Sequence, residues 1–418
     1  MLKKSIWVVL IQFIGVLLSF VTLYFIVGDM TPEVYSLVGT YTVILGVVNT
    51  FSHLGIETVM MRETLYWTEH NDTQKVVEYA TQSMFSRIFG YIILLPLLLI
   101  YIFYIDYTKY DHQYLFLLFM FLIGALASTL NDCMSLIVRS KGGYVFAQFA
   151  KTLNNSIVKT FGLILYLKFG AAVYLYFFSL SSVPLFILFY LYVHKSFSSN
   201  FIQFKPMLKK VWESRFLWLR TDLDYFKNYA DSILVSILFP AHIMGIYSLY
   251  KALENMAKDF IEGFFDVLSQ NLVRFKGNYE RLCKEEKKYN MIRAAILGVV
   301  VIVGVVFAIY SSQIISICNL SNYDHAAELV QCVFIVAIIY ILGKYEINIL
   351  AFFASSKLNF NLTVLISVIS IAAFGALYFI PSLYGALFQR IIVYLTTTVL
   401  SIALFKKYRT EVYTRLFK

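Results

Sequence analysis

The chain has 418 residues, of which 60% are hydrophobic and only 14% are charged. About a quarter of the residues in a soluble globular domain are charged, so this composition excludes a soluble enzyme. Its hydrophobicity also excludes a disordered chain. The formal net charge at neutral pH is +10, which in a soluble protein would suggest nucleic-acid binding. Here the positions of the basic residues decide what the excess means.

Long apolar segments run through the whole chain and are separated by short polar connections. A helix needs about 20 apolar residues to cross the ~30 Å hydrocarbon core of a bilayer, and segments of that length predict an all-α polytopic membrane protein with about twelve transmembrane helices. The first segment is too long for the core of a signal peptide and is expected to be an uncleaved helix. The predicted spans are residues 6–27, 36–59, 84–104, 114–138, 152–167, 172–193, 216–239, 243–269, 291–310, 329–353, 361–380 and 384–405.

Basic residues are concentrated in the connections on one side of the predicted membrane. Because Lys and Arg are enriched in cytoplasmic connections, this side is predicted to be the cytoplasm, and both termini are predicted to lie there. The segment 243–269 carries several charges, but if it did not cross, the basic residues between Arg274 and Arg293 would lie outside the cell. We therefore expect it to span the membrane. The basic excess follows from topology, and no nucleic-acid partner is expected.

The sequence carries no motif for a metal, a nucleotide or another cofactor. Its four cysteines are scattered, without a Cys-x-x-Cys pair and without histidines at zinc-binding spacing. The phosphate-binding pattern Gly-x-x-x-x-Gly-Lys-Ser/Thr is also absent. We expect no metal, no cofactor and no ATP-driven pump in this chain.

An internal repeat relates the two halves of the chain. Residues 34–37 read Val-Tyr-Ser-Leu after the first predicted span, and residues 246–249 read Ile-Tyr-Ser-Leu after the seventh. Six predicted spans separate the copies, so both halves have the same orientation, as in a parallel repeat about an axis along the membrane normal. The repeat predicts two six-helix lobes at residues 1–195 and 215–405, joined by a basic cytoplasmic linker at 196–214 and followed by a basic cytoplasmic tail at 406–418.

Two predicted spans at the start of the second half carry regularly spaced charges. Residues three or four apart lie on one face of an α-helix, so each set forms a stripe. Opposite charges four residues apart can pair along the helix. The pairs at this spacing are Arg220–Asp224, Lys227–Asp231, Glu254–Lys258 and Lys258–Glu262. The stripe in 216–239 consists of Arg220, Asp224, Lys227 and Asp231, and the stripe in 243–269 consists of Lys251, Glu254, Lys258 and Glu262.

Charges inside a membrane need polar surroundings. A charge at the bilayer centre costs roughly 2.5–3.5 kcal/mol, so eight charges facing lipid would cost on the order of 20 kcal/mol, more than the net stability of a typical fold. Two explanations stay open: structural pairing alone, or a wet cavity in which some cations contact a substrate. Three single charges, Arg62, Lys344 and Arg390, can likewise anchor at the interface, pair or bind a ligand.

Several short motifs resemble those of the Wzx-type polysaccharide flippases. Residues 30–37 (Met-Thr-Pro-Glu-Val-Tyr-Ser-Leu) and 54–62 (Leu-Gly-Ile-Glu-Thr-Val-Met-Met-Arg) are similar to the opening signature of that family, although Ser36 stands where the signature usually has glycine. Residues 231–252 are similar to its second-lobe signature, and the resemblance covers essentially the whole chain. The family belongs to the multidrug/oligosaccharidyl-lipid/polysaccharide (MOP) exporter superfamily, which also includes drug and cation antiporters.

The resemblance implies a transporter rather than an enzyme. Such a protein would sit in the bacterial cytoplasmic (inner) membrane and contact membrane lipid. It would move undecaprenyl-pyrophosphate-linked oligosaccharide repeat units, for O-antigen of lipopolysaccharide or a similar surface polysaccharide, to the periplasmic leaflet. Alternating access, with antiport of protons or another cation as a candidate energy source, is the implied mechanism. Polysaccharide polymerase and chain-length machinery are the implied protein partners.

The charged residues suit such a substrate. A pyrophosphate needs cations in a desolvated cleft, and Arg and Lys supply them. Acidic neighbours would balance this charge, keep the phosphate from binding too tightly and carry coupling protons. We expect Arg220, Lys227, Lys251, Lys258, Arg62, Lys344 and Arg390 to bind substrate, and Asp224, Asp231, Glu254 and Glu262 to balance charge or couple ions.

Two other functions stay open. A drug or cation antiporter of the same fold predicts a cavity dominated by acidic residues, whereas the two stripes are balanced. A membrane-embedded glycan polymerase or ligase is expected to carry a large exterior catalytic loop with Arg or His residues. The predicted exterior connections are short and hold few basic residues, which disfavours such an enzyme.

Overall fold

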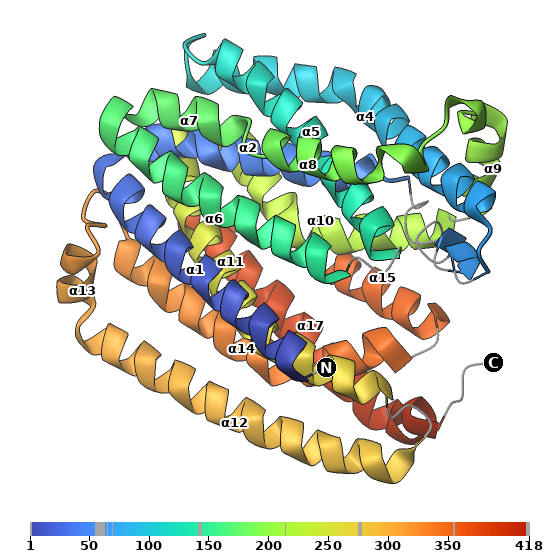
Figure 1. The fold of residues 1–418 in the computed structure, drawn as a ribbon. Helices are drawn as coiled ribbons and strands as arrows, with labels where there is room; N and C mark the ends of the chain where they lie inside the picture. Colours follow the sequence, from blue (N-terminus) through green and yellow to red (C-terminus); the bar gives the residue numbers. More distant parts are fainter. Residues whose placement is uncertain are drawn as a thin grey trace. The chain divides into compact units, whose positions relative to one another are not determined.

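The computed structural model describes residues 2–54, 63–64, 66–68, 70–140, 144–213, 215–274, 278–353 and 356–414. Within these ranges the chain forms helices joined by turns, with no strand (Figure 1). Each predicted span coincides with a helix or with a pair of consecutive helices, except that residues 55–59 lie outside the described residues. The all-helical prediction is therefore confirmed for the described part of the chain.

Residues 33–245 form one compact unit, which we call the α2–α10 unit. Its centre is α5, which packs against α4, α6, α7 and α8. Buried apolar side chains such as Met134, Ile137 and Phe189 form the core between α5 and α8. The helices are α2 (Pro32–Phe51), α4 (Thr73–Lys109), α5 (Leu115–Ser140), α6 (Tyr144–Phe169), α7 (Ala171–Ser179), α8 (Val183–Val193), α9 (Phe204–Glu213) and α10 (Arg215–Leu238), with 3₁₀ turns at His194–Ser196 and Ser199–Phe201.

The close packing of α5 against the end of α7 depends on a glycine. A Cβ atom added at Gly124 would lie 1.8 Å from the backbone oxygen of Ser179. The same oxygen accepts a hydrogen bond of 3.1 Å from the hydroxyl of Tyr41 on α2. Any larger side chain at position 124 would have to push these helices apart, because protein interiors leave no room for such an overlap.

Residues 1–32 and 246–418 form a second compact unit, which we call the α11–α17 unit. In it α14 packs along α17, α12 packs against α14, and α15 packs against α17 (Figure 1). Phe265, Tyr289 and Tyr345 form an aromatic core, with ring centroids 5.0 Å and 4.6 Å apart for the two pairs that share Tyr289. The helices are α1 (Leu2–Asp29), α11 (Ala241–Arg274), α12 (Tyr279–Ile309), α13 (Ser311–Ile317), α14 (Ala326–Phe353), α15 (Ser356–Ala373), α16 (Gly375–Phe379) and α17 (Leu383–Thr414).

A second glycine brings α14 close to α17, the two helices that carry several of the charged residues described below. A Cβ atom at Gly343 would lie 2.7 Å from the hydroxyl oxygen of Thr398. That hydroxyl donates a hydrogen bond of 3.0 Å to the backbone oxygen of Ile339. The small residue and the hydroxyl together fix how closely the two helices pack.

Seven helical segments in the described part of the chain are long and apolar enough to cross a membrane. Three shorter apolar helices lie at Leu17–Asp29, Tyr229–Leu238 and Leu358–Ala373. Apolar side chains are exposed along α12, for example Val299, Ile302 and Ile309, as expected of a surface that faces lipid rather than water. The chain is a multi-pass membrane protein, and the count of about twelve spans with cytoplasmic termini stays a prediction.

Four local features differ from the sequence prediction. The sixth predicted span is two helices, α7 and α8, separated at 180–182 and followed by Pro184 near the start of α8. The eleventh is also broken, between α15 and α16. The linker at 196–214 contains α9, and the connection after α12 contains α13. A proline ends a helix where no neighbour satisfies the freed carbonyl, whereas Pro96 lies inside the continuous α4, as membrane helices tolerate.

The two compact units differ from the predicted lobes in two helices. The first helix, α1, belongs to the α11–α17 unit, and α10 belongs to the α2–α10 unit. Within the α11–α17 unit the side-chain amide of Asn322 donates a hydrogen bond of 2.9 Å to the backbone oxygen of Gly28 on α1. The lobes inferred from the repeat stay a prediction.

Candidate functional site

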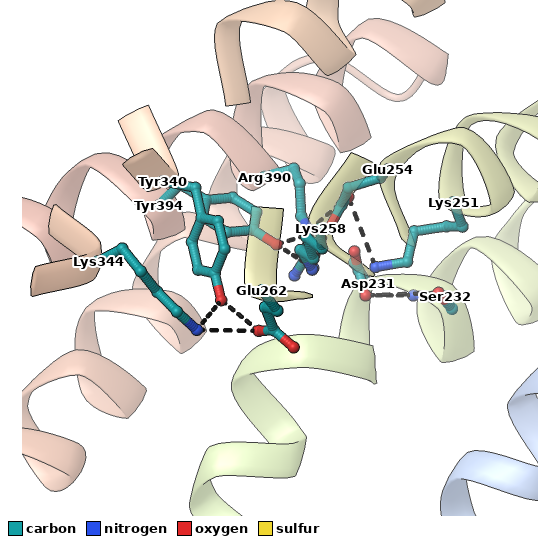
Figure 2. Close-up of polar contacts among 10 residues, drawn as sticks. All are labelled: Asp231, Ser232, Lys251, Glu254, Lys258, Glu262, Tyr340, Lys344, Arg390 and Tyr394. Carbon is teal, nitrogen blue, oxygen red and sulfur yellow. Dashed lines mark hydrogen bonds and ion pairs between the residues drawn. The ribbon is translucent and has the colours of Figure 1, made fainter. Parts of the chain in front are cut away.

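Glu254 on α11 is a charged side chain buried within the α11–α17 unit. Its side chain is 1% exposed, and an ionised carboxylate removed from water is unstable unless cations or hydrogen-bond donors surround it. Lys251, Lys258 and Glu262 lie three, four and eight residues away on the same helix. This spacing puts all four side chains on one helical face. From this face Glu254 contacts α17 and Glu262 contacts α14 (Figure 2).

Arg390 of α17 is the main partner of Glu254. Its Nη2 donates to Oε1 at 2.6 Å, and its Nε donates to Oε2 at 3.0 Å. This two-point contact is the strong form of an Arg–carboxylate pair. Tyr394, one turn further along α17, donates its hydroxyl proton to Oε1 at 2.6 Å. Arg390 is itself only 1% exposed, so this pair is withdrawn from the surface.

Two lysines of α11 complete the surroundings of this carboxylate. Lys258 Nζ lies 2.5 Å from Oε1 of Glu254, and Lys251 Nζ lies 3.8 Å from Oε2. Lys258 also lies over the ring of Tyr394, 4.9 Å from its centroid, which adds a cation–π attraction. We call Lys251, Glu254, Lys258, Arg390 and Tyr394 the Glu254 cluster. It groups three cations around one carboxylate.

A second group, the Glu262 cluster, lies two turns further along α11. Lys344 Nζ of α14 lies 3.2 Å from Oε1 of Glu262 and donates to the hydroxyl of Tyr340 at 2.8 Å. The Tyr340 hydroxyl in turn donates to Glu262 (Figure 2). Together the two clusters contain Lys251, Lys258, Lys344 and Arg390 against Glu254 and Glu262, so cations outnumber carboxylates within them.

Two further ion pairs in this unit differ in how accessible they are. Arg293 of α12 donates to Oε2 of Glu346 on α14 at 2.9 Å, and that carboxylate is 10% exposed. Arg409 of α17 pairs with Glu286 of α12 at 2.6 Å, and the Arg409 side chain is 40% exposed. The first pair is of the buried kind that costs much to break, and the second is close to a surface pair.

Accessibility rises along α11 from one cluster to the other. The exposed fraction of the side chain is 1% at Glu254, 20% at Lys258 and 42% at Glu262. Lys258 therefore lies between the sealed Arg390–Glu254 contact and the accessible Glu262. An ammonium group has three N–H donors, and an anion that arrives from the Glu262 side can meet Lys258 while the Arg390–Glu254 pair stays intact.

Such an arrangement can bind a phosphate-like anion without holding it irreversibly. Arg and Lys form short, strong hydrogen bonds to phosphate oxygens in poorly hydrated surroundings. A carboxylate already in place among the cations competes with the incoming anion and lowers its affinity. Among the described residues, no group of three His, Cys, Asp or Glu side chains is placed to hold a metal ion.

The structure brings together six of the eleven side chains singled out from the sequence. The predicted pair Glu254–Lys258 is confirmed. For the Lys258–Glu262 pair that the same spacing allows, the close contacts of Glu262 are instead with Lys344 and Tyr340 of α14. The six are Lys251, Glu254, Lys258, Glu262, Lys344 and Arg390.

The other candidates are placed less completely. Arg62 lies outside the described residues. Arg220, Asp224 and Lys227 belong to α10, and their side chains lie outside the described part of the structure. Asp231 is fully buried, and its Oδ1 accepts a hydrogen bond of 2.8 Å from the backbone nitrogen of Ser232. That these residues bind substrate, balance charge or couple ions stays a prediction.

Sequence reasoning missed the two tyrosines of the clusters. Tyr340 and Tyr394 provide hydroxyls to Glu262 and Glu254. The chain contains 32 tyrosines, and this residue type is enriched at membrane–water interfaces, so tyrosine alone does not indicate a site. Their spacing could have identified them. Tyr340 stands four residues before Lys344, and Tyr394 stands four residues after Arg390. This spacing places each tyrosine on the same helical face as a charge within an apolar helix.

Comparisons with known proteins bear on the family and the fold. The family model described as "Polysaccharide biosynthesis protein" matches residues 1–268. No curated protein sequence matches the chain. Among solved structures, an inward-facing multidrug resistance MATE family transporter of the MOP superfamily matches with a TM-score of 0.69 and 14% identity over 97% of this chain and 98% of that chain.

Two more solved structures agree with that match. A MATE protein in complex with MaL6 has a TM-score of 0.64 at 14% identity, covering 99% of this chain and 97% of that chain. An outward-facing multidrug resistance MATE family transporter of the MOP superfamily has a TM-score of 0.62 at 14% identity, covering 98% and 96%. At this identity the likeness shows the fold, and it covers nearly the full length of each chain.

Proposed function

The chain belongs to the polysaccharide biosynthesis protein family, and we propose that it is a flippase for undecaprenyl-pyrophosphate-linked oligosaccharides. It would carry repeat units of a surface polysaccharide from the cytoplasmic to the periplasmic leaflet of the bacterial inner membrane. The family match and the MATE-like fold support a transporter of the MOP superfamily. The substrate is inferred from the chemistry of the charged clusters together with the family.

The observation that carries the proposal is the placement of Lys258. It is a partly accessible cation beside a buried Arg–carboxylate pair, within a unit whose helices are largely apolar. Burying several cations around one carboxylate is a costly way to hold helices together, because well-packed apolar residues do so at lower cost. A pyrophosphate head group gives these cations a function, since its oxygens accept charge-assisted hydrogen bonds.

The acidic residues complete the proposed mechanism. Glu254 would compete with the pyrophosphate for Lys258, so that the head group can leave on the other side of the membrane. Glu262 is accessible enough to exchange protons and is the better candidate for proton coupling. Alternating exposure of the site to the two leaflets would then move the head group, as in other transporters with internal repeats.

A drug or cation antiporter of the same fold is the main alternative. Binding an organic cation requires a surplus of carboxylates, whereas the two clusters contain more cations than carboxylates. This charge balance favours an anionic substrate. Transport of an organic cation by the purified protein, without movement of the lipid-linked oligosaccharide, would support the antiporter instead.

The proposal is tested with purified protein in proteoliposomes that contain an undecaprenyl-pyrophosphate-linked oligosaccharide. Translocation is measured as the fraction of oligosaccharide that becomes accessible to a glycosidase added outside. We expect Lys258→Gln to weaken substrate binding about 10- to 100-fold, the value of a hydrogen bond between charged groups, and Lys258→Arg to restore most of it. Lys287→Gln, at an exposed position on α12, is the matched control. Unchanged transport by Lys258→Gln at equal protein amounts would refute the head-group assignment.

A further inference from the structure

The helix α9 has three distinct faces. At 100° per residue, Met207 and Val211 share one face, Phe204, Leu208 and Trp212 share the next, and Lys205 and Lys209 lie beyond them. The helix therefore shows a packed face, an exposed apolar stripe and a basic edge, in that order. This is the arrangement of a helix that lies in the plane of a membrane surface.

The packed face holds α9 firmly on α4 within the same unit. Met207 is fully buried against Tyr79, Phe85 and Phe89 of α4. On the other side of α9, Lys210 Nζ lies 3.3 Å from Oε1 of Glu78 and also contacts Gln82. The position and rotation of α9 on α4 are thus set by both apolar and polar contacts, and the exposed stripe has a defined direction.

The stripe is exposed although its residues are large and apolar. Phe204 is 48% exposed, Leu208 43% and Trp212 69%. Three such side chains in a row on a single ten-residue helix are unusual for a surface in contact with water, where contiguous apolar patches are small. Tryptophan is also enriched at the interface between membrane and water.

The neighbouring part of α4 shows where the stripe lies relative to lipid. An exposed apolar band on α4 begins at Ile88 and continues through Ile92 and Leu97. The ring of Phe204 lies 5.0 Å from that of Phe89, at the beginning of this band. In Figure 1, α9 lies beside one end of α4. The stripe on α9 is therefore level with the end of the exposed apolar band of α4, and the contacts of Lys210 with Glu78 and Gln82 lie on the polar side of that end.

The basic edge selects the lipid. Lys205 and Lys209 are exposed on α9, and Arg215 lies over the ring of Trp212 at 4.7 Å. We propose that α9 is an in-plane anchor that inserts Phe204, Leu208 and Trp212 between lipid head groups and binds anionic phospholipid through Lys205 and Lys209. This inference does not rest on the proposed transport function.

The test measures contact between Trp212 and lipid in the full-length protein. The protein is placed in nanodiscs of phosphatidylcholine, or of equal parts phosphatidylcholine and phosphatidylglycerol, with or without lipids brominated near the head-group end of the chain. Subtracting the fluorescence of the Trp212→Phe variant isolates the Trp212 signal, because phenylalanine keeps the stripe apolar. We expect the brominated lipid to quench this signal, and to quench it more when phosphatidylglycerol is present.

Charge removal separates the two parts of the proposal. Each lysine near an anionic surface strengthens association with that surface about five-fold. The variant Lys205→Gln/Lys209→Gln should therefore weaken the association of α9 with anionic lipid about 30-fold and abolish the effect of phosphatidylglycerol on quenching. The control Lys287→Gln/Lys288→Gln removes the same charge from exposed positions on α12 and should retain the effect. Two results would overturn the proposal: quenching of Trp212 by aqueous iodide but not by brominated lipid, which would indicate a surface for a protein partner, or an unchanged phosphatidylglycerol effect in the α9 variant.

Discussion

Replacing Glu254 by glutamine should destabilise the protein more than any other single change in the charged clusters. Glutamine has nearly the same shape, so packing is kept while the negative charge is removed. Arg390 and Lys258 contact the carboxylate at 2.6 Å and 2.5 Å. Without the carboxylate these two cations would repel each other at short range. The variant Lys258→Gln should cost less, because Glu254 keeps its two-point contact with Arg390.

The size of the effect follows from burial. Removing one partner of a buried ion pair costs about 3–5 kcal/mol, and Glu254 and Arg390 are each 1% exposed. For a folding unit of this size, 1 kcal/mol lowers the melting temperature by about 2–4 °C, so the expected decrease is roughly 6–20 °C. Lys258 is 20% exposed and its partner Glu254 keeps Arg390, so its replacement removes one charge-assisted hydrogen bond and should cost about 1.5–3 kcal/mol.

The assay is thermal unfolding of the purified protein in detergent, followed by fluorescence, with and without inorganic pyrophosphate. Glu328→Gln on α14 is the control, because that carboxylate is 48% exposed and lies 3.6 Å from His325. Pyrophosphate should raise the melting temperature of Glu254→Gln more than that of the wild type, since the competing carboxylate is gone and a ligand that binds only the folded state stabilises it. Equal melting temperatures for the Glu254→Gln and Glu328→Gln variants would refute the reasoning.

Two more stability predictions follow from the packing and the ion pairs. Gly124→Ala should lower the yield of folded protein in size-exclusion chromatography, because its Cβ would lie 1.8 Å from a backbone oxygen. The control Gly298→Ala has no atom within 4 Å of the added Cβ and should gain about 0.5–1 kcal/mol of helix stability. Equal yields for the two variants would contradict this prediction. Arg293→Gln should lower the melting temperature more than Arg409→Gln. The first change leaves Glu346, which is 10% exposed, without its arginine, whereas the Arg409–Glu286 pair lies near the surface. The reverse order would show that burial does not govern the stability of these pairs.

The helices were predictable from the sequence because the length and apolarity of a membrane helix are local properties. The breaks were harder to predict. Pro96 lies inside α4 and Pro184 lies at the beginning of α8, although both stand in apolar segments. Whether a proline ends a membrane helix depends on which neighbour satisfies the freed carbonyl, and that information lies in other helices.

The site was predictable only as far as one helix determines it. The spacing of Glu254 and Lys258 within α11 indicated their pairing, and the structure has it. The same spacing allows a Lys258–Glu262 pair, but the structure places Lys344 of α14 at 3.2 Å from Glu262. Arg390 could be recognised as an embedded charge, but its pairing with Glu254 depends on how α17 packs, which no periodicity within a single helix reveals.

The linker between the predicted lobes shows a different limit. Its positive charge indicated a cytoplasmic connection, but it gave no sign of the apolar residues at every fourth position. Phe204, Leu208 and Trp212 form a continuous stripe only once α9 is helical. A short amphipathic helix carries too few residues for its pattern to stand out from the surrounding sequence.

The central claim is tested most directly in a cell of the native host from which the gene has been deleted. The measured quantity is the distribution of undecaprenyl-linked oligosaccharides between the two leaflets of the inner membrane, together with the amount of surface polysaccharide. The proposed function predicts repeat units trapped on the cytoplasmic leaflet and loss of the surface polysaccharide. Complementation with the wild type should restore both, and Lys258→Gln should restore little. Repeat units that still cross, with normal surface polysaccharide, would contradict the assignment.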